Sequence, residues 1–145
     1  MSRTLEDRLR AAGVRPSAQR MAVAQYVLTT DEHPSAEQVH TRVAEKFPFL
    51  SRATVYNTLN LFVKEGLLRQ LVLAEGSVVF DPKLERHHHF IDDDTGAIED
   101  VPWAAVRVGA PKLEGYDVRE TMVVMRGRKL GRPRVPTNRP STRKT

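Results

Sequence analysis

The sequence predicts an α+β protein whose N-terminal half is a winged helix-turn-helix domain. Two patterns predict this fold class. Residues 4–65 carry apolar side chains at helical spacing in four successive segments, and residues 68–81 then carry them at strand spacing on both sides of a short turn. The length of 145 residues suits one domain or two small ones and is sufficient for a hydrophobic core.

Four helices are expected, and capping residues mark their ends. They cover residues 4–12, 18–28, 35–47 and 51–65. Ser17, Ser35 and Ser51 are N-cap residues, whose hydroxyl groups can accept a hydrogen bond from an amide of the first turn. Gln38 stands three residues after Ser35 and completes a capping box. Gly66 ends the fourth helix, since glycine readily adopts the left-handed conformation that terminates helices.

A β-hairpin follows the fourth helix, with strands over residues 68–73 and 78–81 and a turn between them. Helices followed by such a hairpin are the order of a winged helix, in which the last helix enters the major groove of DNA. The outward face of that helix is polar and carries Arg52, Thr54, Tyr56, Asn57 and Asn60. Arginine and asparagine can pair with base edges. An ordinary solvated helix face would show the same pattern, so periodicity alone leaves both interpretations open.

Three adjacent histidines follow the hairpin in a segment with strand character. Because strand side chains alternate, His87 and His89 share one face and His88 points away. Asp81 precedes this segment and Asp100 follows it. Imidazole with carboxylate suits iron, manganese or zinc better than calcium or a cluster. A polar, solvated strand edge is the alternative interpretation.

The charge of the chain is unevenly distributed. The formal net charge is +5, but residues 126–145 hold eight Lys or Arg and no acidic residue, which leaves −3 on residues 1–125. This proline-rich basic segment is expected to be disordered, either attracting DNA phosphates or merely solvating the chain. Cysteine is absent, which excludes disulfides and thiolate metal sites. No apolar run approaches the roughly 18 residues of a membrane span, so a cytoplasmic protein without a membrane partner is expected.

Three motifs stand in a recognisable order. They are His33-Pro34-Ser35-Ala36-Glu37, Ser51-Arg52-Ala53-Thr54-Val55-Tyr56-Asn57-Thr58-Leu59 and His87-His88-His89. With them, the chain resembles the ferric uptake regulator family over residues 5–126. The resemblance implies a dimeric, metal-dependent transcription factor with a C-terminal α/β dimerisation domain. The implied organisation is a winged-helix domain over residues 1–81, a hinge over 82–86, a dimerisation and metal-sensing domain over 87–126 and a disordered basic tail over 127–145.

The resemblance also implies the residues that carry function. The regulatory metal, Fe²⁺ or Mn²⁺ (with Zn²⁺ able to replace it in purified protein), is held by His33, Asp81, His87, His89 and Asp100. The two aspartates favour the peroxide-sensing branch, in which iron-catalysed oxidation of His33 or His87 ends repression. A homodimer is expected to bind an operator in double-stranded DNA, an inverted repeat. Its DNA contacts are expected from Arg15, Arg20, Ser51, Arg52, Thr54, Tyr56 and Asn57.

The chain departs from the family pattern at the structural zinc and leaves two alternatives. Many members hold a structural zinc with Cys-x-x-Cys pairs, but residues 92–96 and 127–129 contain no cysteine, so no structural zinc is expected. Residues 101–109 and 115–118 also resemble the iron response regulator branch, and a response to iron, haem or manganese is the first alternative. The second is an enzyme, because two histidines and a carboxylate also form the facial triad of non-haem iron oxygenases. The preceding winged helix argues against an enzyme.

Three further residues receive structural interpretations. His88 and His40 are expected to be surface histidines without an assigned role. Trp103 is expected to be a core anchor of the dimerisation domain.

Overall fold

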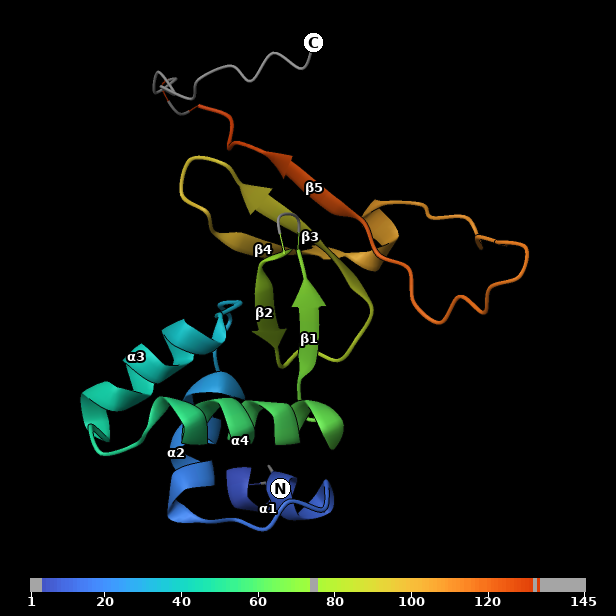
Figure 1. The fold of residues 1–145 in the computed structure, drawn as a ribbon. Coiled ribbons are helices and arrows are strands. Elements are labelled where there is room, and N and C mark those ends of the chain that lie inside the picture. The colour runs from blue at the N-terminus through green and yellow to red at the C-terminus, as the bar shows by residue number, and fades with distance from the viewer. Residues whose placement is uncertain (1–3, 74–75, 132, 134–145) are drawn as a thin grey trace. The chain divides into compact units, whose positions relative to one another are not determined.

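The computed structural model describes residues 4–73, 76–131 and 133. The chain divides into two compact units, Met1–His87 and His88–Thr145, and each is considered by itself. The first unit contains the four helices and the hairpin, and the second contains a small sheet (Figure 1). The α+β fold class expected from the sequence is confirmed.

Four helices build the first unit, and serine or threonine caps each of them. They are α1 (Leu5–Ala11), α2 (Ala18–Val27), α3 (Ala36–Lys46) and α4 (Arg52–Lys64). Ser17, Ser35 and Ser51 each accept a hydrogen bond from an amide of the first turn, and Ser35 forms the expected capping box with Gln38. Gly66 follows α4 with a φ of +77°, a conformation that a side chain would disfavour.

One hydrophobic core holds these helices together. The helix α4 contributes Val55, Leu59 and Phe62, all with no exposed surface, and α3 contributes Val39 and Val43. Full burial of one such side chain stabilises a fold by about 1.5–3 kcal/mol. These residues recur every three or four positions, so they form the apolar face of each helix and fix which face of α4 remains exposed.

The hairpin forms the wing of the first unit and ends at a candidate ligand. Its strands β1 (Arg69–Val72) and β2 (Val78–Asp81) pair antiparallel, with Arg69 opposite Asp81. Two residues of the expected turn, 74 and 75, lie outside the described residues. The carbonyl of Pro34 accepts a hydrogen bond of 2.9 Å from the amide of Phe80. The loop before α3 is thereby attached to the strand β2.

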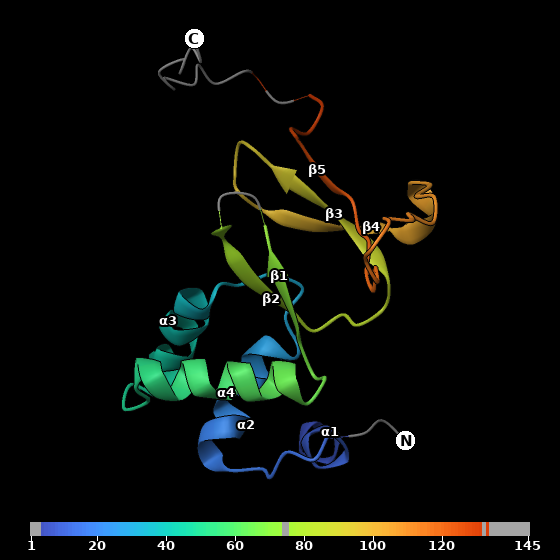
Figure 2. The ribbon, with the colours of Figure 1, turned by 45° about the vertical axis from the view of Figure 1, so that its right-hand side comes forward.

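The second unit is a three-stranded sheet in the order β4-β3-β5, with β3 in the middle (Figure 2). Its elements are β3 (His87–Asp92), β4 (Ile98–Pro102), the short 3-10 helix η2 (Trp103–Ala105) and β5 (Val124–Gly127). The strands β3 and β5 are parallel, with His89 opposite Val124. The sequence did not predict β5. A connection of 18 residues, 106–123, all described, leads from η2 to β5 without a helix or strand.

Ion pairs join the end of β5 and the residues just after it to the turn after β3 and to β4. Arg126 pairs with Asp93, Arg128 with Asp94 and Lys129 with Glu99, at 3.4, 3.4 and 2.6 Å. We refer to these three pairs as the ionic edge. The first residues of the expected tail thus contact the sheet, while residue 132 and residues 134–145 lie outside the described part of the chain. Among the described residues, no helix is long and apolar enough to cross a membrane.

Candidate metal centre and DNA-binding face

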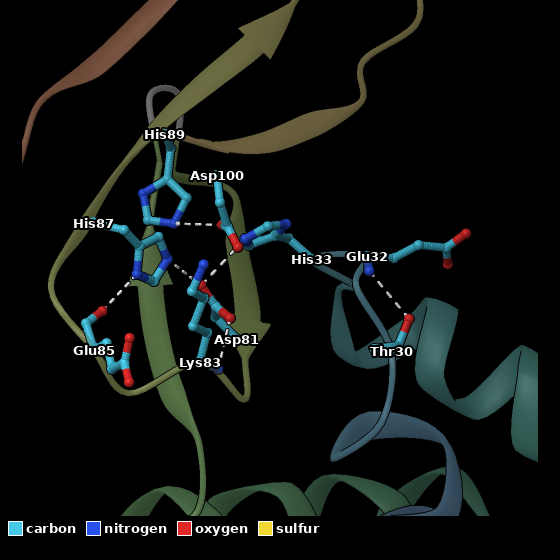
Figure 3. Close-up of polar contacts among 9 residues, drawn as sticks. All are labelled: Thr30, Glu32, His33, Asp81, Lys83, Glu85, His87, His89 and Asp100. Carbon is cyan, nitrogen blue, oxygen red and sulfur yellow. Dashed lines mark hydrogen bonds and ion pairs between the residues drawn. The ribbon is translucent and has the colours of Figure 1, made fainter. Parts of the chain in front are cut away.

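Three expected metal ligands meet inside the first unit. His33 lies in the loop before α3, Asp81 ends β2, and His87 begins β3. The Oδ2 atom of Asp81 lies 3.1 Å from Nε2 of His33 and 2.8 Å from Nε2 of His87 (Figure 3). All three side chains are at most 3% exposed. One carboxylate oxygen therefore faces two imidazole nitrogens in a buried position.

Hydrogen bonds on the outer side of this group fix its orientation. Nδ1 of His87 lies 2.6 Å from the carbonyl oxygen of Glu85 (Figure 3). Since a carbonyl only accepts, Nδ1 carries a hydrogen, and a neutral ring then directs the lone pair of Nε2 toward Asp81. The other oxygen of Asp81, Oδ1, accepts the amide of Lys83 at 2.9 Å.

This arrangement fits a cation. A neutral His87 with its hydrogen on Nδ1 presents the lone pair of Nε2 to Asp81 Oδ2 at 2.8 Å, and two facing acceptors need a proton or a metal ion between them. A divalent metal ion accepts both, and an outer hydrogen bond to backbone carbonyl is the usual partner of a metal-binding histidine. The donor set of two imidazoles and a carboxylate suits a first-row transition metal.

The other two expected ligands lie close together in the second unit. His89 is buried on the middle strand β3, and Asp100 lies on the neighbouring strand β4 and is partly exposed. Nε2 of His89 lies 3.8 Å from Oδ1 of Asp100. Because β3 begins at His87 and its side chains alternate, His87 and His89 leave this strand on the same side.

The expectation that His88 is a surface residue is wrong. Its side chain is completely buried and stacks on Trp103, with ring centroids 4.5 Å apart and planes at 18°. The strand β3 is buried along both faces, so a side chain directed away from the ligands enters the interior. Trp103 is partly exposed, and its ring packs on this histidine.

His40 also has a structural role that the sequence did not indicate. Its Nε2 atom lies 3.2 Å from the carbonyl oxygen of Leu50, in the loop between α3 and α4. The histidine therefore helps to hold the segment that leads into the N-cap Ser51.

Four of the expected DNA-binding residues line one open groove of about 540 Å³ in the first unit. They are Arg15, Arg20, Thr54 and Asn57. Nη1 of Arg20 donates to the carbonyl of Arg15 at 2.9 Å, which orients the guanidinium group. Gln19 also lines the groove, and sequence reasoning missed it although it directly precedes Arg20.

The other three expected DNA contacts lie at the start and on the exposed side of α4. The hydroxyl of Ser51 accepts from the amide of Thr54 at 3.1 Å and is occupied as the helix cap. Arg52 pairs with Glu37 at 3.4 Å in an exposed contact, and Tyr56 is 40% exposed. Both side chains are accessible to a partner that approaches α4.

A winged helix followed by a unit with histidine and aspartate donors defines a class of metal-responsive transcriptional regulators. The family model "Ferric uptake regulator family" matches residues 11–122, and the chain belongs to this family. Family members are transcriptional regulators rather than enzymes, which removes the oxygenase alternative.

The chain is similar to named members of this family. It is 37% identical over 92 residues to the "Peroxide-responsive repressor PerR" of Staphylococcus epidermidis, and the match covers 63% of this chain and 61% of that protein. A solved ferric uptake regulator from Pseudomonas aeruginosa with manganese is 25% identical, with a TM-score of 0.65, and the match covers 88% and 99% of the two chains. A zinc-bound manganese uptake regulator is 24% identical, with a TM-score of 0.67 and 88% and 100% coverage. These structures share the fold.

Proposed function

We propose that this protein is a metal-dependent repressor that releases DNA when peroxide oxidises its own histidine ligands. The observation that carries the proposal is the buried oxygen of Asp81 that faces Nε2 of both His33 and His87. Such a group, held by outer hydrogen bonds, favours a divalent cation. The identity of 37% to a peroxide-responsive repressor supports the peroxide signal.

In the proposed metal centre, His89 and Asp100 complete the set of ligands begun by His33, Asp81 and His87. His33, Asp81 and His87 belong to the first unit. His89 and Asp100 belong to the second. A metal ion that binds both groups would favour one arrangement of the two units, because a ligand shifts a conformational equilibrium by its differential affinity. Fe²⁺ or Mn²⁺ would serve in the cell, and Zn²⁺ could replace them in purified protein.

DNA binding is proposed for the groove and the exposed side of α4. The residues are Arg15, Arg20, Ser51, Arg52, Thr54, Tyr56 and Asn57. In a homodimer, the arrangement fixed by the metal would set the spacing between two copies of α4. That spacing must match successive turns of the major groove, so an inverted repeat is the expected operator.

The proposed signal is oxidation of His33 or His87. Bound Fe²⁺ would catalyse cleavage of the peroxide O–O bond next to these rings and would be regenerated, so the electrons that reduce peroxide come from the ring. In the net reaction, one oxygen atom of hydrogen peroxide replaces a hydrogen on a ring carbon, and the other leaves as water. The ring loses two electrons and becomes a poorer ligand, which weakens the metal centre. Thiol oxidation cannot be the signal, because the chain has no cysteine.

The experiment is DNA binding by apo, Mn²⁺-loaded and Fe²⁺-loaded protein, before and after mild peroxide treatment, combined with peptide mass spectrometry. We expect both metals to promote binding, and peroxide to release only the iron form with an added oxygen on His33 or His87. Iron-loaded protein that stays unmodified and DNA-bound would refute peroxide sensing. The chain would then be a regulator that responds to iron, haem or manganese availability, the alternative raised by its likeness to the iron response branch.

A further inference from the structure

The connection of residues 106–123 is held at both ends by one side chain. The imidazole of His88 stacks on Trp103, just before the connection begins. Nδ1 of the same ring accepts a hydrogen bond of 3.0 Å from the amide of Val123, at the last residue of the connection. His88 therefore closes the connection, although it lies outside it in sequence.

Val123, whose amide donates to His88, also forms a hydrogen bond with the candidate ligand His89. The carbonyl of Val123 accepts a hydrogen bond of 3.1 Å from the amide of His89. Both polar backbone groups of Val123 are thus used by successive residues of β3, the amide by the side chain of His88 and the carbonyl by the backbone of His89. The strand β5 begins at the next residue, Val124. The backbone position of His89 is consequently tied to the end of the connection.

The chemistry of the contact requires a hydrogen-bond acceptor at position 88. Because Nδ1 accepts the amide, a neutral ring carries its hydrogen on Nε2, and this atom is buried without a hydrogen-bond partner among the described residues. An apolar side chain would avoid that unsatisfied group but could not accept the amide of Val123, which would then lose its partner in this partly buried contact. Packing alone does not explain a histidine here.

We propose that His88 is a positioning residue of the metal centre, which couples metal binding by His89 to the ordering of residues 106–123. The proposal rests on the proposed metal site. When His89 is held by a metal, β3 is held with it, and His88 keeps Trp103 and Val123 in place. When the metal is lost, both ends of the connection are less restrained.

The connection provides its own reporters. Trp103 is the single tryptophan of the chain, so its fluorescence reports on the stack. Arg107, Lys112 and Arg119 are exposed residues of the connection at which trypsin cleaves. Metal binding should change the emission of Trp103 and slow cleavage at these three residues.

The test uses the full chain and Co²⁺, whose visible absorption reports the geometry of its ligands. The variants are His88→Leu, His88→Asn and the control His40→Asn, which changes a histidine that bonds a loop of the first unit. We expect His88→Leu to weaken Co²⁺ binding by about tenfold, the lower range for loss of an outer partner, to shift its spectrum and to abolish the protection from trypsin. His88→Asn, whose amide oxygen can accept from Val123 but which lacks the ring that stacks on Trp103, should lose less of each property than His88→Leu. The control should behave as the unmodified protein.

Two outcomes separate the proposals. If the unmodified protein binds no Co²⁺, the proposed metal site fails. If it binds Co²⁺ and His88→Leu shows the same affinity, spectrum and protection, the role of His88 is refuted. Should His88→Leu not fold, Trp103→Ala removes the stack from a partly exposed position. Unchanged Co²⁺ affinity and protection in that folded variant would refute the coupling equally.

Discussion

The hydroxyl of Tyr26 donates a hydrogen bond of 3.0 Å to Oε2 of Glu32, the residue that precedes His33. Arg42 of α3 lies over the Tyr26 ring at 5.7 Å and pairs with Glu32 at 3.7 Å. The amide of Glu32 also donates to the hydroxyl of Thr30 (Figure 3). These contacts connect α2 and α3 to the loop that carries a candidate metal ligand.

This contact makes stability depend on pH in the alkaline range. Burial, and then the hydrogen bond to Glu32, raise the pKa of Tyr26 above its ordinary value of 10.0. The folded state therefore favours the protonated phenol, so the contribution of Tyr26 is complete below pH 10 and is lost as the pH rises through the raised pKa. In urea unfolding, the stability advantage of the unmodified protein over Tyr26→Phe should decrease above pH 10. An advantage that is constant with pH would contradict this prediction.

Asp81→Asn should abolish tight metal binding. The substitution preserves size but replaces the oxygen that faces His33 and His87 with a neutral amide. We expect Mn²⁺ affinity, measured by calorimetry, to fall by more than the roughly 10–100-fold that loss of an outer-sphere partner costs. Asp117→Asn is the matched control, since Asp117 is exposed and pairs only with Arg119 among the contacts seen. Equal affinities of the two variants would disprove a ligand role for Asp81.

Purified protein should contain no structural zinc. Denaturing mass spectrometry should give the mass of the bare chain, and native spectra should show metal only at the proposed centre. His87→Ala should remove that metal, because His87 supplies one of the nitrogens that face Asp81. One tightly held zinc per chain that survives in His87→Ala would reveal a second strong site and overturn this expectation.

Two substitutions should separate base recognition from phosphate attraction. Tyr56→Ala removes an exposed side chain of α4 and should cost about 1–3 kcal/mol on the specific operator only, if the ring contacts a base edge. Arg20→Ala removes a cation from the groove and should weaken binding to all sequences. The slope of log affinity against log salt concentration should become shallower by about one. Binding titrations on operator and unrelated DNA at several salt concentrations distinguish the two. Loss of sequence preference in Arg20→Ala would assign base reading to the groove instead.

The local features of the fold were predictable because local chemistry determines them. The caps Ser17, Ser35 and Ser51 and the hairpin up to Asp81 followed from hydroxyl groups, glycines and periodicity, and the structure confirms them. The family motifs brought together His33 and Asp81, which periodicity alone could not do. In the structure, a backbone hydrogen bond between Phe80 and Pro34 holds the two segments together, and no local pattern reveals it.

Two features depend on distant contacts and were therefore not predictable. The strand β5 is four residues long, and its parallel partner β3 lies more than 30 residues earlier, so no turn or alternating run announces it. The alternation of side chains gave the direction of His88 relative to its neighbours. It could not show that Trp103 would cover that face of the strand.

The ionic edge differs chemically from the histidine ligands that the proposed sensor would lose to oxidation. Asp93, Asp94 and Glu99 join β5 to the rest of the sheet through arginine and lysine partners. Carboxylate, guanidinium and ammonium groups stand outside the oxidation ladder that converts thiolates to sulfenic and higher acids. Peroxide that modifies a histidine ligand would therefore leave this scaffold chemically intact. A spent molecule would keep these contacts but lose its affinity for metal, and a cell would restore the response by replacing the chain.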